Sequence, residues 1–431
     1  MNYYSLHRKA PIVSFKEATV LGQAPDKGLY FPEQIPQVSK ELIDHIEDYS
    51  NEQIAFEVIK PYVGNTIDED HLFQIVLETV NFPIPLQPIH NGISALELFH
   101  GPTLAFKDIG ARFMSRCLGA FVKDTHQKVT VLVATSGDTG GAVANGFYDV
   151  PGVEVVILYP SGKVSSVQEK QLTTLGKNIR ALEVEGSFDD CQRMVKQAFA
   201  DPLLTEKIFL TSANSINVAR WLPQQFYYFF AYKQWKQKDQ PPVICVPSGN
   251  FGNICAGVLA HLSGLPIKHF IAACNINDTV PRFMNSGKME PHAPIATLSN
   301  AMDVSEPSNF IRILELFHQQ IPALKEKFSS CTVSDAITLE TIQQVYKDHG
   351  YLLDPHGAVG YHALESYLRN NPNNSGIFLE TAHPVKFPDA IKLALGLDVP
   401  IPTALEPLLK QEKISTRIDS DYESLKDFLI D

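Results

Sequence analysis

The most reactive candidate in the sequence is Lys107, which ends the run Gly-Pro-Thr-Leu-Ala-Phe-Lys at residues 101–107. From Ile109 onward apolar residues recur at steps of three and four, so Lys107 falls at the start of a predicted helix. The partial positive charge of a helix N-terminus and the apolar neighbours would lower the pKa of its amine. Such a lysine can serve as a nucleophile or a base near neutral pH. The alternative is a surface lysine whose stem covers Phe106, and further parts of a site must decide between the two.

Two loops rich in glycine and small polar residues follow predicted strands. Residues 134–141 read Ala-Thr-Ser-Gly-Asp-Thr-Gly-Gly, and such a loop can direct backbone N–H groups at a carboxylate. A helix cap with glycines for the turn explains this loop equally well. Residues 248–253 read Ser-Gly-Asn-Phe-Gly-Asn, and successive donors at a helix start favour a phosphate. This second loop has neither the ending of a P-loop nor the spacing Gly-x-Gly-x-x-Gly.

Two smaller features accompany these loops. Residues 214–220 read Asn-Ser-Ile-Asn-Val-Ala-Arg. This segment places amides, a hydroxyl and a guanidinium close together, where they could bind a phosphate. A polar loop that ends in a capped helix is the alternative interpretation. Thr381 follows a predicted strand, and its hydroxyl should lie at the strand's carboxyl end, where open α/β sheets bind ligands. His383 close by is interpreted as structural.

The elements that must position these residues follow an alternating pattern. Beyond residue 83, short β-branched runs alternate with helical stretches, which predicts parallel sheets covered by helices on both faces. Prolines 83, 85 and 88 separate this region from a turn-rich, partly helical opening at residues 1–82. The predicted strands are residues 129–134, 153–159, 179–184, 243–246, 270–274 and 377–379.

Composition excludes several classes of function. A chain of 431 residues exceeds one compact core and predicts two or three domains. Its net charge of −12, with no long basic run, argues against nucleic acid and anionic membranes as partners. Six scattered cysteines without a Cys-x-x-Cys pair indicate neither disulfides nor a structural metal site. With no signal segment and no apolar run of membrane-spanning length, we expect a cytoplasmic protein.

A lysine of lowered pKa, a phosphate loop, a carboxylate loop and a hydroxyl at a strand end together describe a pyridoxal phosphate site. In this combination the sequence resembles the threonine synthase family of fold-type II pyridoxal phosphate enzymes. The resemblance covers nearly the whole chain and rests on segments in the family's order, namely residues 24–30, 99–108, 135–140, 214–217, 248–253 and 381–384.

The resemblance implies an α/β fold like that of the tryptophan synthase β subunit. Two parallel-rich α/β sheet domains would accompany an N-terminal, mostly helical domain. We expect the N-terminal domain at residues 1–82 and the small α/β domain at 119–211. The large cofactor-binding domain would comprise residues 83–118 and 212–431.

The resemblance also assigns roles to individual residues. It makes Lys107 the residue that forms the Schiff base, and it implies that Thr381 binds the ring nitrogen. Asp138 stands where related enzymes carry an asparagine that contacts the cofactor's 3-hydroxyl. The cofactor's phosphate would be held by Gly249, Asn250, Phe251, Gly252 and Asn253. The substrate would be bound by Ser136, Gly137 and Thr139 at its carboxylate and by Lys163, Asn214, Ser215 and Arg220 at its phosphate.

The implied activity is that of a carbon–oxygen lyase acting on phosphates, in the last step of threonine biosynthesis. O-phospho-L-homoserine and water would give L-threonine and phosphate by γ-elimination and β-addition, with Lys107 as a base. A phospho-lyase of the same fold that releases 2-oxobutanoate is the nearest alternative. A non-catalytic phosphometabolite-binding protein, from a different class, would use both loops and leave Lys107 idle. The sequence leaves open a monomer or a homodimer.

Overall fold

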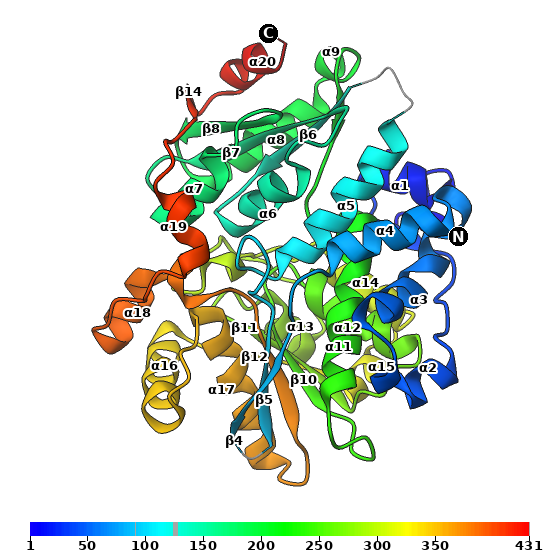
Figure 1. Ribbon diagram of the computed structural model, residues 1–431, viewed down its shortest axis with the longest axis vertical. Coiled ribbons are helices and arrows are strands. Elements are labelled where there is room, and N and C mark those ends of the chain that lie inside the picture. Colours follow the sequence, from blue (N-terminus) through cyan, green and yellow to red (C-terminus); the bar gives the residue numbers. More distant parts are fainter. Residues whose placement is uncertain (91, 124–127, 431) are drawn as a thin grey trace.

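The described residues form three sheets, and Figure 1 shows the two larger ones, one above the other. The computed structural model describes residues 1–90, 92–123 and 128–430, and residues 91, 124–127 and 431 of the predicted domains lie outside this description. The six cysteines are all free. Within the described ranges, no helix is long and apolar enough to cross a bilayer, and no three His, Cys, Asp or Glu side chains are grouped to hold a metal ion.

The largest sheet has six strands in the order β12-β11-β10-β13-β5-β4. All its pairs are parallel except β4 with β5. The central strands β10, β11 and β13 are buried along their whole length, which explains their continuous apolar runs. The bounds are β4 (Leu86–His90), β5 (Ile93–Glu97), β10 (Val243–Pro247), β11 (His269–Cys274), β12 (Phe328–Thr332) and β13 (Gly376–Glu380).

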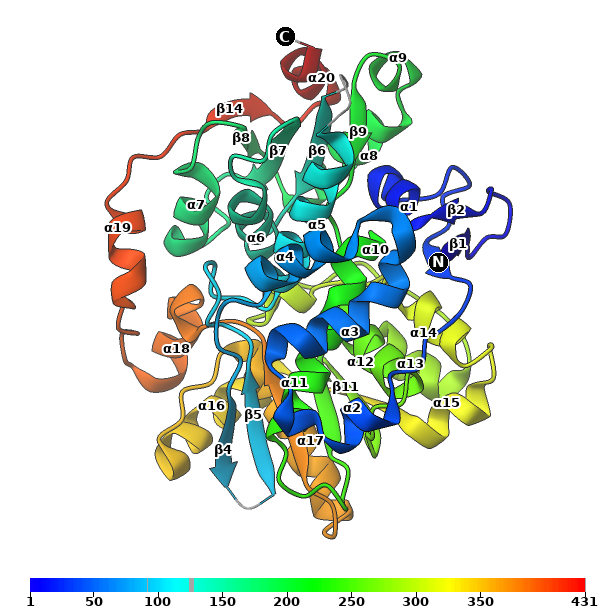
Figure 2. The same ribbon diagram turned by 45° about the vertical axis from the view of Figure 1, so that its right-hand side comes forward.

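The second sheet has five parallel strands in the order β14-β8-β7-β6-β9. Alternate residues of β6 enter different cores: Val131 and Val133 pack with α5 and α6, whereas Leu132 packs with α8. Helices therefore cover both faces, as the alternating pattern predicts (Figure 2). The bounds are β6 (Val129–Ala134), β7 (Val153–Pro160), β8 (Ile179–Glu185), β9 (Phe209–Thr211), β14 (Thr416–Asp419), α5 (Lys107–Val122), α6 (Asp138–Phe147), α7 (Ser166–Thr173) and α8 (Phe188–Ala200).

The N-terminal region is mostly helical, as expected, with one small antiparallel sheet. Ser14 with Glu17 and Ser50 with Gln53 form capping boxes, which explains where α1 and α3 begin. The elements here are β1 (Asn2–Ser5), β2 (Val13–Ser14), α1 (Phe15–Leu21), β3 (Tyr30–Pro32), α2 (Lys40–Asp44), α3 (Asn51–Val63) and α4 (Glu69–Thr79).

The C-terminal segment corrects one domain boundary. The expected large domain extends to residue 431, but β14 pairs with β8 of the five-stranded sheet, so the prediction is wrong for residues 416–430. The helix α20 (Tyr422–Ile430) packs against α8, and its Leu425 is buried in the same core as β6. Figure 2 shows the chain rising from α18 (Pro388–Leu395) through α19 (Glu406–Leu409) to β14 and α20 at the top.

One continuous core connects the six-stranded and the five-stranded sheets. The helix α5 packs against both α6 and α10, and one continuous core contains residues of the N-terminal helices, α5, β6 and α12. The remaining helices are α9 (Pro202–Thr205), α10 (Val218–Trp221), α11 (Phe226–Gln234), α12 (Gly252–Leu262), α13 (Thr279–Ser286), α14 (Phe310–Leu316), α15 (Ile321–Lys327), α16 (Asp335–His349) and α17 (Pro355–Asn370).

Candidate active site

Lys107 is the first residue of α5, as the sequence predicts. The loop before it lies antiparallel to the segment that follows β13. The Phe106 N–H donates to the Thr381 carbonyl at 2.9 Å, and the His383 N–H donates to the Leu104 carbonyl at 3.0 Å. These bonds place Lys107 beside the carboxyl end of β13, and Thr381 with it.

The turn that precedes Lys107 is held by buried polar groups. The Asp108 carboxylate accepts the Thr103 N–H at 2.9 Å and the Thr103 hydroxyl at 2.5 Å. The Thr103 carbonyl accepts from Gln171 at 3.0 Å and from Lys386 at 2.8 Å. Leu104 takes the left-handed conformation with φ +56°, which costs free energy in a residue with a branched side chain. The hydrogen bonds around Thr103 and Asp108 hold this turn in place.

The side chain of Lys107 is mostly buried, with 16% of its surface exposed. Its Nζ lies 4.6 Å from the centroid of the Phe106 ring and 3.7 Å from Asp138 Oδ2. Burial lowers the pKa of Lys107; Asp138 opposes this shift, whereas the cations of Lys386 and Arg220 reinforce it. The amine is therefore more readily deprotonated than an ordinary lysine, which suits a nucleophile or a base.

Asp138, the first residue of α6, is a buried carboxylate between two lysines. Its Oδ1 lies 2.7 Å from the Nζ of Lys386 and accepts a 3.0 Å hydrogen bond from Gln168 Nε2. Burial alone would raise the pKa of Asp138, but Lys386 and Lys107 outweigh it and hold this pKa well below its usual range. Gly137 before it has φ +140°, and a Cβ there would lie 2.5 Å from the Gln168 side chain, so only glycine fits.

The loop at residues 248–253 ends at α12, whose N-terminus has no side-chain cap. Phe251 takes a left-handed conformation with φ +61°, and the first N–H groups of the helix lack partners within it. Asn253 Nδ2 is buried without a hydrogen-bond partner among the described residues. A Cβ on Gly249 would lie 2.6 Å from the Met302 Cα, so the backbone there is closely covered. This arrangement favours an anion with several acceptor oxygens.

The loop at residues 214–217 lies against the loop at 248–253. The Ser215 hydroxyl accepts hydrogen bonds from Asn250 Nδ2 at 2.7 Å and from Asn309 Nδ2 at 3.1 Å. Asn214 precedes it and is partly buried. The structure thus brings two of the sequence-predicted loops together.

Arg220 is buried beside α5. It lies against Gly110, which follows Lys107 by about one helical turn. A Cβ on Gly110 would lie 3.2 Å from Arg220 Nε, and the guanidinium donates to the Ala213 carbonyl. Within the described part of the chain, its Nε has no hydrogen-bond partner. Burial lowers the pKa of Arg220 to about 10, and the group stays a cation at neutral pH.

The other residues predicted to bind the substrate differ in how far they are buried. Ser136 and Thr139 are partly buried on either side of Gly137 and Asp138, so the residues of this loop remain together. Lys163 is exposed on the turn after β7. In the described ranges, no hydrogen bond or ion pair joins its side chain to the other candidates, and its predicted contact with a phosphate stays untested.

Sequence reasoning missed three residues of this site, Lys386, Gln168 and Arg312. Lys386 lies two residues beyond the segment 381–384, and that proximity was the available signal. The buried guanidinium of Arg312 donates to the carbonyls of Tyr30 at 2.9 Å and Ile216 at 2.7 Å. It also donates to the Ser215 carbonyl and to Asn309 Oδ1. Since most of these partners are backbone atoms from distant segments, nothing in the sequence marks Arg312.

Known proteins match the chain from end to end. Residues 82–377 match the family described as pyridoxal-phosphate dependent enzyme, residues 2–80 match the threonine synthase N terminus, and residues 357–429 match the threonine synthase C-terminal region. The threonine synthase of Serratia marcescens is 44% identical over 431 residues, which cover 100% of this chain and 99% of that protein. The chain belongs to the threonine synthase family.

Solved structures of threonine synthases agree with this assignment. The crystal structure of threonine synthase from Escherichia coli is 43% identical, covers 100% of this chain and 99% of its own, and superposes with a TM-score of 0.92. A PLP-bound threonine synthase from Brucella melitensis is 35% identical with a TM-score of 0.93, over 100% and 98% of the two chains. The expected fold-type II architecture is therefore confirmed.

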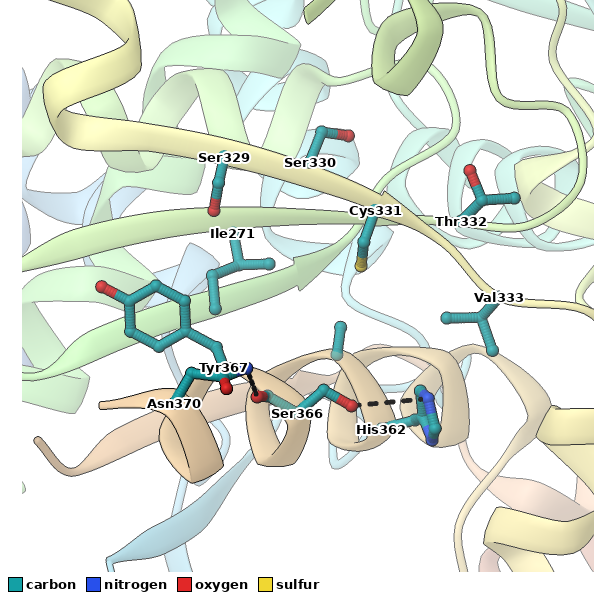
Figure 3. Close-up of a pocket in the computed structure, with 11 residues that line it drawn as sticks. Ile271, Ser329, Ser330, Cys331, Thr332, Val333, His362, Ser366, Tyr367 and Asn370 are labelled. Atoms are coloured by element: carbon teal, nitrogen blue, oxygen red, sulfur yellow. Dashed lines mark hydrogen bonds between the residues drawn. The ribbon is translucent and has the colours of Figure 1, made fainter. Parts of the chain in front are cut away.

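The residues present fit the cofactor on which this family depends. A mostly buried amine of lowered pKa suits its aldehyde, and the uncapped start of α12 suits its phosphate. The unpaired Asn253 Nδ2 is one more donor at that loop. The Thr381 hydroxyl follows β13 directly and comes from a chain segment hydrogen-bonded to the loop of Lys107. A separate pocket of about 260 Å³ between β12 and α17 contains none of these residues (Figure 3).

Gly249→Ala is expected to weaken binding of pyridoxal phosphate by about 10–100-fold. The added Cβ would lie 2.6 Å from the Met302 Cα and 2.9 Å from the Ala301 carbonyl oxygen. Because both are backbone atoms, the loop must shift and its N–H groups lose their alignment. Cofactor titration of the apoprotein measures the effect. Gly119→Ala on α5, where the nearest atom is one methyl of Val150, is the matched control and should bind as the wild type does.

Proposed function

We propose that this protein converts O-phospho-L-homoserine and water into L-threonine and phosphate. The proposal is supported above all by one observation: the Lys107 amine, its pKa lowered, lies beside the end of β13 and 3.7 Å from the Asp138 carboxylate. Full-length relatives at 44% identity named threonine synthase support the same activity.

In the proposed site, the uncapped start of α12 would hold the cofactor's phosphate and Lys107 would hold its aldehyde carbon. When bound, pyridoxal phosphate supplies a ring that accepts the electrons released when a proton leaves the substrate's α-carbon. The Thr381 hydroxyl is assigned to the ring nitrogen, where a neutral group does not force protonation. Asp138 is assigned to the side of the ring that carries the hydroxyl. These roles combine the positions described above with the family resemblance.

Lys107 then acts as the proton carrier of the reaction. Its Nζ would stay close to the reacting carbons, because α5 fixes the backbone of Lys107. Its lowered pKa lets it take a proton near neutral pH and return it later. We assign to it proton transfer at the α-, β- and γ-carbons. Loss of phosphate from the γ-carbon and addition of water at the β-carbon complete the conversion.

The substrate's phosphate is assigned to the loop at residues 214–220, with Lys163 as a further candidate, and its carboxylate to Ser136, Gly137 and Thr139. The first assignment is supported by the contact of Ser215 with Asn250, which sets the two loops side by side. The unpaired Nε of the buried Arg220 also supports it.

Arg220→Met is expected to raise the KM for O-phospho-L-homoserine about 10–100-fold, because a donor to its phosphate is lost while side-chain volume is largely kept. The visible spectrum of the bound cofactor should not change. Steady-state kinetics and absorbance measure the two effects. Arg116→Met, on the outer part of α5, is the control and should leave KM unchanged. An unchanged KM in Arg220→Met contradicts the assignment.

The function is tested by adding O-phospho-L-homoserine to purified, cofactor-loaded protein and measuring threonine, phosphate and 2-oxobutanoate together. Equal amounts of threonine and phosphate are expected. Phosphate with 2-oxobutanoate instead would identify the phospho-lyase. Protein that takes up no pyridoxal phosphate would point to a non-catalytic binding protein. A cytoplasmic location, a monomer or homodimer, and the absence of nucleic-acid and membrane partners remain predictions from the sequence.

A further inference from the structure

The buried amine of Lys386 contacts Asp138 and has no role among those proposed above. Lys386 ends the short 3-10 helix η5 (Pro384–Lys386), and its side chain has no exposed surface. Its Nζ lies 2.7 Å from Asp138 Oδ1 and donates to the Thr103 carbonyl at 2.8 Å. The amine therefore joins the end of the β13 segment to both the start of α6 and the turn before Lys107.

The two oxygens of Asp138 have different surroundings. Oδ1 is engaged by Lys386 Nζ and by Gln168 Nε2, which lies at 3.0 Å. Oδ2 is 3.7 Å from Lys107 Nζ. The charged groups in contact with Asp138 are thus Lys107 from α5 and Lys386 from η5, and the neutral amide of Gln168 comes from α7. Lys386 and Gln168 together fix the rotation of the carboxylate and leave Oδ2 on the side of Lys107.

A carboxylate that is this deeply buried stays ionised only while a cation or several donors compensate the loss of water. Lys107 cannot be that permanent partner, since its amine becomes part of the covalent link when the cofactor binds. Lys386 makes no such link, and its Nζ lies 2.7 Å from Oδ1. The wild-type protein thus has a source of positive charge for Asp138 that is independent of the state of Lys107.

We infer that Lys386 is a positioning residue for the cofactor: it keeps Asp138 ionised and turns Oδ2 toward the cofactor's hydroxyl side. The inference rests on the proposed function and adds to it the charge of the group that faces the ring. It predicts that Asp138 is a carboxylate throughout the cycle.

Removal of the Lys386 charge should therefore change how the cofactor spectrum depends on pH. In the wild type, the pKa of Asp138 lies well below its usual range, so Asp138 does not titrate near neutral pH. In Lys386→Met the opposing effect of burial dominates, the pKa rises, and Asp138 takes up a proton as the pH falls. A new ionisation should appear in the visible absorbance between about pH 5 and about pH 8, and cofactor affinity at neutral pH should fall about 10-fold.

Two further variants separate charge from packing. Lys386→Arg keeps the cation and should show the wild-type pH profile. The double variant Lys386→Met with Asp138→Asn makes both members of the pair neutral, so the new ionisation should vanish and most of the lost affinity should return. Asp138→Asn alone completes the cycle and should not titrate in this range.

The experiment is a pH titration of the absorbance of each cofactor-loaded protein, with cofactor affinity measured on the apoproteins. A Lys386→Met profile that superposes on the wild type overturns the inference, provided that the wild type binds the cofactor. A wild type that binds none overturns the proposed function instead. If Lys386→Met does not fold, the double variant tests the inference instead. A double variant that does not regain cofactor binding contradicts the pairing of Lys386 with Asp138.

Discussion

Lys107→Ala is expected to lower turnover by more than about 10⁴-fold and to remove the covalent link to the cofactor. Under the proposed function, the variant loses both the nucleophile for the aldehyde and the group that carries protons. The other lysine in contact with Asp138, Lys386, cannot replace it, because its amine is held by Asp138 and by the Thr103 carbonyl. Activity with O-phospho-L-homoserine and the visible spectrum before and after borohydride measure the two losses.

The matched control is Lys123→Ala, which makes the same change at the exposed C-terminal end of α5. It should keep wild-type turnover and a reducible chromophore. A Lys107→Ala protein that retains a chromophore bleached by borohydride would falsify the assignment of Lys107. Retained cofactor without the chromophore is compatible with it, since in the proposed site the start of α12 would still hold the phosphate.

Arg312→Met is expected to lower the free energy of unfolding by at least about 3 kcal/mol. Methionine keeps most of the side-chain volume of arginine. The substitution removes the hydrogen-bond donor of four buried acceptors, namely Asn309 Oδ1 and the carbonyls of residues 30, 215 and 216. The contact of the guanidinium with the Trp221 ring, at 4.3 Å, is lost as well. Because Ser215 and Asn309 support Asn250, cofactor affinity should fall together with stability.

Urea unfolding of the apoprotein measures this cost without the contribution of the bound cofactor. Arg282→Met is the control, since Arg282 forms a partly exposed i, i+4 ion pair with Asp278 at 2.9 Å on α13. Such a pair contributes about 0.3–0.5 kcal/mol. A stability change in Arg312→Met no larger than that of the control contradicts the role of Arg312.

The central parallel strands β6, β7, β8, β10, β11 and β13 could be predicted, because burial on both faces leaves a continuous apolar run. The parallel strands β5 and β9 were missed. The strand predicted at 129–134 has the bounds of β6, and the runs at 153–159 and 179–184 fall within β7 and β8. The edge strand β12, with the sequence Phe-Ser-Ser-Cys-Thr, and the exposed β14 have no such run and were missed. Strands at the edge of a sheet need less apolar surface, so periodicity identifies them poorly.

The residues of the candidate site fall into two groups. Some can be predicted from the local sequence, and others depend on contacts with distant segments. Lys107, the loop at 134–141 and the loop at 248–253 carry local signals, because helix starts and close backbone approaches need particular residue types. Lys386 and Arg312 act through contacts with segments far away in sequence, at Asp138 and at Tyr30. An isolated lysine or arginine has no periodic neighbours that would indicate such a contact. The one signal for Lys386 is its position two residues beyond the segment 381–384, and Arg312 has none.

The pairing of β14 with β8 also has a consequence for synthesis of the chain. On the ribosome, β6 to β9 emerge long before residues 416–419, so β8 forms an open edge of a growing sheet until those residues have emerged. Open edges pair readily with other strands, and an unfinished chain is exposed to aggregation at this edge. Residues 416–419 therefore close this edge of the sheet only after they emerge, and a chain that stops before them leaves β8 uncovered.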